Sequence, residues 1–282
     1  MATQARGIAD ERPPRHDAPR PRAIIVAGGK GGVGKTQIAV NLAVALGLKR
    51  RSVLLVDGNL DMGGVDLALG MEMGLNLGHA ARGERTVEEI VFTGPADIGV
   101  VAAPRGEEEC AALAPWQRER LARELAAAAA GCDFLIIDSA AGAAPAAFDL
   151  AHRPEVIAVA TPDPAAVADA YATAKHAARC DPRADVQVVV NFAADALDAR
   201  RAWHAIAEVA GKFLERLPGF LGHVPQDPLV MRAGRRQEVL VVKYPESPAA
   251  EAIAAIAARL CSRGAGQATA ADARRGAPAA VV

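Results

Sequence analysis

The sequence has little that would draw it to a charged surface, a metal cluster or a membrane interior. Its 32 Lys and Arg almost balance its 33 Asp and Glu, for a formal net charge of −1. No global field therefore attracts nucleic acid or an acidic membrane, and any such contact needs a local patch. The four cysteines, Cys110, Cys132, Cys180 and Cys261, are scattered, and no pair has metal-ligand spacing.

Long apolar runs are also missing. No window reaches the length of a membrane-spanning helix, and the chain does not start with an apolar signal segment. These absences favour a cytosolic protein with reduced thiols.

The composition predicts one folded domain with two unstructured ends. The chain has 282 residues, about half of them hydrophobic, which suits a single α/β domain with a large core. Residues 1–22 are rich in Arg and Pro, and residues 264–282 are Gly, Ala and Arg without apolar periodicity. Such segments cannot bury enough apolar surface to fold alone. We expect disorder at 1–22 and 264–282 and a folded domain at 23–263.

A glycine-rich loop at residues 28–36 organises the chain. It reads Gly-Gly-Lys-Gly-Gly-Val-Gly-Lys-Thr and fits G-x-x-x-x-G-K-[ST] between an apolar β-branched run and a segment with helical periodicity. Glycines let backbone N–H groups turn toward phosphates, and the helix N-terminus adds its positive dipole end. Lys35 would contact the β- and γ-phosphates, and the Thr36 hydroxyl would bind Mg²⁺. The predicted nucleotide contacts in this stretch are Gly29, Lys30, Gly31, Gly32, Val33, Gly34, Lys35, Thr36 and Gln37.

Two further apolar runs end in an aspartate. Asp57 follows a buried-type strand at 52–56, and Asp138 follows 134–137 and begins Asp-Ser-Ala-Ala-Gly, the layout of a Walker B strand. Ligands of an open parallel sheet bind at the carboxyl ends of its strands. We therefore expect Thr36, Asp57 and Asp138 to form the Mg²⁺ site.

Other strand and helix ends complete the predicted architecture. The runs ending at Thr161 and Asn191 alternate with helices, which predicts a doubly wound, mainly parallel α/β sheet flanked by helices. Asn191 has both the acceptor and the donors to pair with an adenine edge. Asp163 precedes a proline and is expected to cap a helix rather than to take part in chemistry, and Ser247 is expected to cap a last helix ending at residue 263.

The loop holds a second lysine, Lys30, that the simple pattern does not require. Residues 30–36, Lys-Gly-Gly-Val-Gly-Lys-Thr, resemble the deviant Walker A motif of the MinD/ParA ATPases. In that family the extra lysine reaches the partner's nucleotide. The resemblance, which spans residues 23–262, therefore implies an ATP-sandwich homodimer that uses ATP and Mg²⁺, with Lys30 and Lys35 in catalytic roles.

Three segments resemble the FlhG/FleN-type members that set flagellar number and placement, namely 53–70, 161–175 and 231–237. The resemblance implies three kinds of partner: a flagellar SRP-type GTPase like FlhF, a flagellar transcription activator or C-ring proteins. It implies that Asn191 reads adenine and that the loop with Pro225 and Asp227 lies along the base and ribose. Many members have Arg where Phe192 stands, so the neighbouring contact is left open. A cytoplasmic protein is implied, with peripheral placement at the inner membrane or cell pole as an open alternative.

The chain departs from the family at switch I. Where members usually have D-x-D, this sequence has Asp57-Gly58-Asn59. The second Asp orients or deprotonates the attacking water in the family, whereas an amide can orient water but cannot act as a base. The resemblance thus predicts slow hydrolysis, with Asn59 as the orienting residue unless Asp61 substitutes.

Three rival functions differ in what they require of the sequence. A ParA-type partitioning ATPase that binds nonspecific DNA needs a broad basic face, and only Arg232, Arg235, Arg236 and the N-terminal arginines are available. A nitrogenase-reductase-like electron carrier needs a cysteine after switch II, and a ligase-type enzyme leaves Lys30 unexplained. Membrane binding is expected to be weak or absent, because residues 262–282 lack a basic amphipathic stretch with bulky apolar residues.

Overall fold

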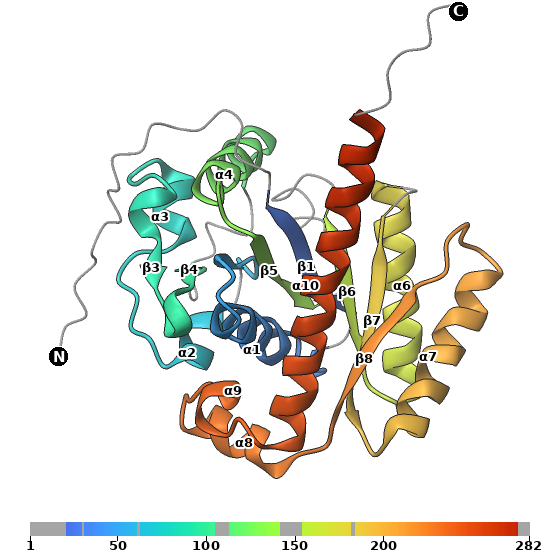
Figure 1. Cartoon of the computed structure of the whole chain (residues 1–282). Helices are drawn as coiled ribbons and strands as arrows, with labels where there is room; N and C mark the ends of the chain where they lie inside the picture. The colour runs from blue at the N-terminus through green and yellow to red at the C-terminus, as the bar shows by residue number, and fades with distance from the viewer. Residues whose placement is uncertain are drawn as a thin grey trace, which may run out of the picture.

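The computed structural model of the protein describes residues 21–29, 31–60, 63–104, 113–141, 154–181 and 184–275, without the side chains of 141 and 264–275. One eight-stranded sheet runs through it in the order β3-β4-β2-β5-β1-β6-β7-β8 (Figure 1). The strand pairs from β4 to β8 are parallel, and the edge pair of β3 and β4 is antiparallel. The predicted doubly wound, mainly parallel sheet is confirmed.

The strands alternate with helices along most of the chain. The strands are β1 (Arg22–Gly28), β2 (Val53–Asp57), β3 (Phe92–Thr93), β4 (Gly99–Val101), β5 (Phe134–Ala141), β6 (Glu155–Ala160), β7 (Val186–Ala193) and β8 (Gly219–Pro225). The α-helices are α1 (Lys35–Leu48), α2 (Val65–Leu69), α3 (Leu77–Arg82), α4 (Pro115–Ala128), α6 (Pro164–Cys180), α7 (Ala196–Gly211), α8 (Pro228–Arg235), α9 (Leu240–Lys243) and α10 (Pro248–Arg275). Two short 3₁₀ helices, η1 (Glu88–Ile90) and η2 (Pro95–Asp97), precede β3 and β4.

Helices cover both faces of the sheet, and each face has its own apolar core. Side chains of a strand alternate between faces. Accordingly, Ile24 and Val26 of β1 join the core under α1, α8, α9 and α10, while Ile25 joins the core under α3, α4, α6 and α7. In Figure 1, α10 crosses the front of the sheet beside α1, and α8 and α9 lie at the foot of both. Because strands are buried on both sides, they read as continuous apolar runs in the sequence.

Two helix starts agree with their predicted caps. Asp163 caps α6 by accepting a hydrogen bond from Ala166 N at 3.0 Å, with Pro164 at the first helical position. Ser247 Oγ accepts from Ala250 N at 3.1 Å at the start of α10. This helix extends to Arg275 rather than ending at residue 263, in keeping with the helix propensity of its many alanines. None of the helices in the described ranges is long and apolar enough to cross a membrane.

Candidate functional site

The glycine loop joins β1 to α1, and Lys35 is the first residue of that helix. Gly32 and Gly34 have φ values of +83° and +90°, in the left-handed region that favours glycine. A Cβ added at Gly31 or Gly32 would meet no atom within 4 Å, so one side of the loop is open. A Cβ at Gly28 would lie 2.8 Å from the carbonyl oxygen of Val159, so the loop's first residue is pressed against β6. The loop is therefore anchored at its start and open toward a ligand.

Asp57 and Asp138 meet at the carboxyl edge of the sheet, as expected. They are register partners on the adjacent strands β2 and β5. Asp57 is fully buried and accepts three backbone hydrogen bonds: Oδ1 accepts from Asn59 N at 3.1 Å, and Oδ2 accepts from Gly64 N at 2.7 Å and Val65 N at 3.0 Å. Burial raises the pKa of Asp57, and these hydrogen bonds act against the rise. Both oxygens of Asp57 thus already hold the backbone that follows β2.

Asp138 is different, because only one of its oxygens has a partner. Thr36 Oγ1 donates to Asp138 Oδ2 at 2.6 Å. Asp138 is 1 % exposed, and its Oδ1 has no hydrogen-bond partner among the described residues. Burial and the nearby charge of Asp57 raise the pKa of Asp138 to about 7, while the Thr36 hydrogen bond and the Lys35 charge lower it. A buried carboxylate oxygen without a donor is costly unless a proton or a cation occupies it.

Lys35 supplies the positive charge beside this pair. Its side chain is only 8 % exposed. Burial lowers the pKa of Lys35, and the negative charge of Asp138 acts against the decrease. The Lys35 ammonium therefore interacts with the buried Asp138 carboxyl, whose strand neighbour is Asp57, and an open loop of backbone N–H groups begins one turn earlier in the chain. Such a group of side chains suits an oxyanion that arrives together with a divalent cation.

Asn191 is found in a contact that the sequence did not predict. The side chain is buried, and its Nδ2 donates to the carbonyl oxygen of Val33 at 2.9 Å. A Cβ at Gly34 would lie 2.3 Å from that nitrogen, so the end of β7 is packed directly against the loop. The donor expected to read adenine is thus engaged in fixing the loop. The adenine contact stays a prediction.

A cavity of about 430 Å³ lies beside the open side of the loop, within the usual size range of small-ligand pockets. Phe192, with φ of +55°, lies on its wall. The lining residues come from the loop, the segment after β6, the end of β7, α7 and the segment after β8, and they are Gly31, Gly32, Val33, Thr161, Pro162, Asp163, Phe192, Asp198 and Gln226. Gln226 lies between the predicted contacts Pro225 and Asp227. Nothing in the sequence pointed to Asp198.

The other predicted site residues have less direct placements. Pro225 ends β8, and Asp227 caps α8, where its oxygens accept from Leu229 N at 2.9 Å and Ala249 N at 3.2 Å. Gln37, in the first turn of α1, accepts from Asn41 Nδ2 with both its backbone carbonyl oxygen and its Oε1, at 2.9 Å and 3.4 Å. Asn59 is half-buried just after β2. Lys30 and Asp61 lie outside the described residues, so their predicted roles stay predictions.

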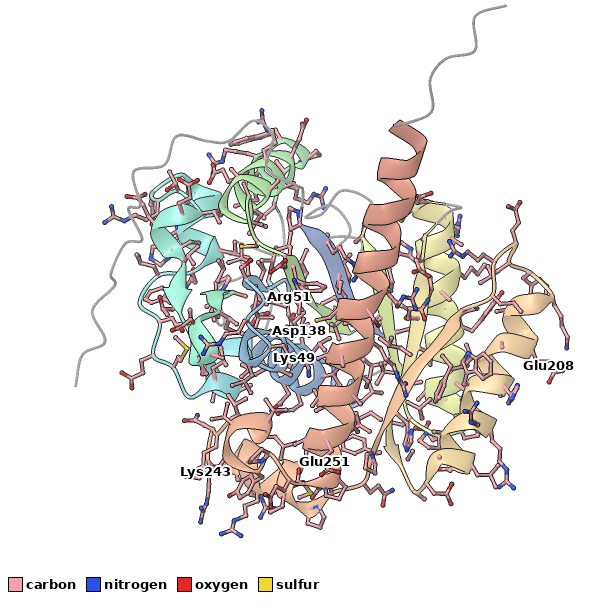
Figure 2. All side chains as sticks on the ribbon, in the orientation of Figure 1. Lys49, Arg51, Asp138, Glu208, Lys243 and Glu251 are labelled. Carbon is pink, nitrogen blue, oxygen red and sulfur yellow. The ribbon has the colours of Figure 1, made fainter. Side chains whose placement is uncertain are left out.

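Figure 2 labels Asp138 near the middle of the view, next to α1, and its side chain is 1 % exposed. Ile136 and Val26, which precede the site on β5 and β1, belong to the core under α1 and α10. The site is therefore supported by fully buried strands on one side and opens at the strand ends. This arrangement fixes the charged groups before any ligand arrives, which reduces the cost of ordering them on binding.

Comparisons with known proteins agree on one family. The family model named ParA, described as NUBPL iron-transfer P-loop NTPase, matches residues 21–261. The chain is 30 % identical over 242 residues to the antiactivator FleN of Pseudomonas aeruginosa, covering 86 % of each chain. It is 26 % identical to the flagellum site-determining protein YlxH of Helicobacter pylori, covering 85 % of this chain and 82 % of that protein.

Solved structures show the same fold. The septum site-determining protein MinD of Pyrococcus horikoshii, solved in complex with Mg-ADP, has a TM-score of 0.73 at 23 % identity and covers 85 % of this chain and 96 % of its own. The cell division ATPase MinD of Pyrococcus furiosus also has a TM-score of 0.73, at 26 % identity, and covers 86 % of this chain and 98 % of its own.

Proposed function

Because the chain belongs to the ParA family of P-loop NTPases, we propose that it is a switch that dimerises with ATP and hydrolyses it slowly. The observation that carries the proposal is the Oδ1 of Asp138, which has no partner among the described residues and lies beside the Thr36 hydroxyl and the Lys35 ammonium. Such a buried oxygen is costly unless a proton or a cation occupies it, and a bound divalent cation would fill this place. The open side of the glycine loop lies next to it.

ATP and Mg²⁺ fit the residues present. Backbone N–H groups of residues 31–36 and the Lys35 ammonium would hold the phosphates, and Asp138 with Thr36 would hold Mg²⁺. The hydrogen bond between Thr36 and Asp138 would break when Mg²⁺ binds between them. Asp57 would act on the metal's water shell, because its own oxygens already accept backbone hydrogen bonds. When bound, the Mg²⁺ nucleotide supplies a phosphoryl group whose transfer depends mainly on positioning and charge neutralisation.

The proposed slow turnover rests on switch I. Asn59 lies two residues after the buried Asp57, and its backbone N–H is tied to that carboxyl. A side-chain amide at this point orients water but takes up no proton. We expect tight ATP binding and a long-lived dimer in which Lys30 reaches the partner's nucleotide. Asp61 remains the candidate substitute for the missing carboxylate.

A flagellar role is supported by the two relatives whose names refer to flagellar control, FleN and YlxH. The proposed partners are an FlhF-like GTPase, a flagellar transcription activator or C-ring proteins, with weak or absent binding to membranes. DNA partitioning is the alternative, and it predicts that ATP recruits bulk DNA instead. Iron transfer is not proposed, because the cysteines are scattered along the chain. Pull-downs with ATP against ADP distinguish flagellar proteins from bulk DNA.

Nucleotide binding is the direct test. Lys35→Ala should lose ATP binding, measured by isothermal titration with Mg²⁺, because the ammonium and the loop N–H groups hold the phosphates together. Lys49→Ala is the matched control, since Lys49 is an exposed lysine at the other end of the same helix. Equal ATP affinity in the parent and Lys35→Ala would refute the assigned site.

A further inference from the structure

Helix α8 carries a surface that the nucleotide site does not use. Three arginines, Arg232, Arg235 and Arg236, surround a groove of about 330 Å³ whose other walls are Pro228 and Met231. Met231 is 62 % exposed, so its side chain offers the groove an accessible apolar wall. We call these five residues the arginine groove. It combines an apolar wall with a dense positive charge, although the whole chain has a net charge of only −1.

The charges of this groove are only partly balanced by neighbours. Arg232 lies over the ring of Tyr244, 6.0 Å from its centroid. Tyr244 donates its hydroxyl to Glu238 at 3.4 Å, and Glu238 also pairs with Lys243 at 3.8 Å. The Glu238 carboxylate is therefore already engaged by Tyr244 and Lys243. Within the described residues, Arg235 and Arg236 form no ion pair, so their charge is available to a partner.

The segment with the groove also contacts both elements that frame the nucleotide site. Asn41 of α1 is 2 % exposed, and its Oδ1 accepts from Val241 N of α9 at 3.1 Å. Its Nδ2 donates to Gln37 O, one residue after Thr36. At the end of α2, Gly70 has a φ of +66°, and a Cβ there would lie 2.4 Å from Gln237 O. Helix α2 starts at Val65, whose N–H donates to Asp57.

We propose that the arginine groove docks an acidic segment of a partner protein, with an apolar side chain of that segment against Met231, and that the bound nucleotide sets the affinity. Carboxylates match the arginines in charge and geometry, and a groove with an apolar wall selects a side chain rather than a phosphate backbone. Nucleic acid instead needs phosphate contacts spread over a broad basic surface. The nucleotide dependence rests on the proposed function, because it requires that ATP and ADP arrange α1 and α2 differently.

The test uses the full chain and three probes: a fluorescein-labelled peptide of alternating glutamates and leucines, labelled oligothymidine of equal length, and phosphatidylglycerol vesicles. We expect the peptide to bind most tightly, and Arg235→Glu/Arg236→Glu to weaken it at least about tenfold, measured by fluorescence anisotropy. The matched control is Arg123→Glu/Arg201→Glu, which reverses two exposed arginines on α4 and α7 and should bind like the parent. Binding with ATP and with ADP should differ by about fivefold or more in Kd.

Each other outcome contradicts one part of the docking proposal. An unchanged affinity in Arg235→Glu/Arg236→Glu, or tighter binding of oligothymidine or vesicles through these arginines, overturns the acidic-segment assignment. If the double variant instead loses self-association while peptide binding stays, the groove belongs to an interface between copies. Equal peptide affinity with ATP and ADP overturns the nucleotide dependence alone. Titration of ATP itself is recorded in parallel, so a failure of the proposed nucleotide binding is recognised separately.

Discussion

At the residue scale, the negative charge of the buried Asp138 carboxyl is poorly compensated by its surroundings. Its environment raises the pKa to about 7 from a usual value of 3.8, chiefly through burial and then through the charge of Asp57. Between these two pH values the folded protein binds a proton there that the unfolded chain does not. The group's contribution to stability is therefore present at low pH and is lost as the pH rises through about 7.

This decrease of stability with rising pH gives a prediction for the metal-free protein. In EDTA at pH 8, Asp138→Asn should raise the Tm by roughly 5 °C, because the amide has no charge to lose or gain. At pH 5 the gain should shrink, since the native carboxyl is then protonated. Glu215→Gln, at an exposed position, is the control and should change the Tm little at either pH. Scanning calorimetry at both pH values measures this, and an equal effect at pH 5 and pH 8 would argue against a raised pKa.

A second residue-scale prediction concerns Asn59. Replacing it with Asp should restore a general base and raise the single-turnover rate of ATP hydrolysis on the order of a hundredfold, with ATP affinity nearly unchanged. Asp61→Ala separates the alternative, because turnover should collapse in that variant if Asp61 already supplies the base. Fast hydrolysis in the parent that neither change affects would reject both versions.

The sequence predicted which residues meet at the site better than what they bond to. Thr36, Asp57 and Asp138 were expected together because parallel strands end at one edge. The backbone hydrogen bonds that Gly64 and Val65 donate to Asp57, and the hydrogen bond that Asn191 donates to Val33 O, were not expected. Backbone donors have no signature in the sequence, so a carboxylate or amide that binds them looks the same as one that binds a ligand.

At the element scale, regular elements were predicted where the apolar pattern was long and caps were present. The strands β2 and β6 and the starts of α6 and α10 agree closely with expectation. Strands β5 and β7 run past the expected ends at Asp138 and Asn191, to Ala141 and Ala193. Between residues 71 and 97 the structure has short elements, namely α3, the 3₁₀ helices η1 and η2, and the two-residue strand β3. Elements of two or three residues leave no periodicity to read.

The contact between α2 and the segment before α9 gives an element-scale prediction. Gly70→Ala should destabilise the protein more than Gly131→Ala. Both glycines have left-handed φ values, +66° and +86°, and so share a backbone cost of about 1–2 kcal/mol. Only at Gly70 does the added Cβ meet a backbone atom, Gln237 O, whereas Gly131 has nothing within 4 Å. Urea denaturation should show an excess of at least about 1 kcal/mol for Gly70→Ala.

If the two variants were equally destabilised, the close approach of α2 to Gln237 would carry no energetic weight. The arginine groove would then be coupled to the nucleotide site only through the contact of Asn41 with Val241, among the two contacts proposed here. Measuring the m-value together with the midpoint separates a change in the folded state from a change in the denatured chain.

At the scale of the whole molecule, the α/β class and the strand-helix alternation followed from the sequence, because a parallel sheet buried on both faces leaves continuous apolar runs. The arginine groove did not follow, although its three arginines were noted. A charged cluster on one helical turn is usually a solvated face, and the groove beside the exposed Met231 became visible only in the structure. Dimerisation is likewise a property of two chains, and it stays a prediction of the family resemblance.

Sedimentation velocity of the full chain with Mg²⁺ and either ADP or a saturating, slowly hydrolysed ATP tests the central claim most directly. We predict a monomer with ADP and a dimer with ATP, because Lys30 is proposed to complete the partner's nucleotide site only when the γ-phosphate is present. Lys30→Ala should remain monomeric with ATP while still binding it. A parent that binds ATP but sediments identically with both nucleotides, or a Lys30→Ala variant that dimerises as well as the parent, would contradict the account.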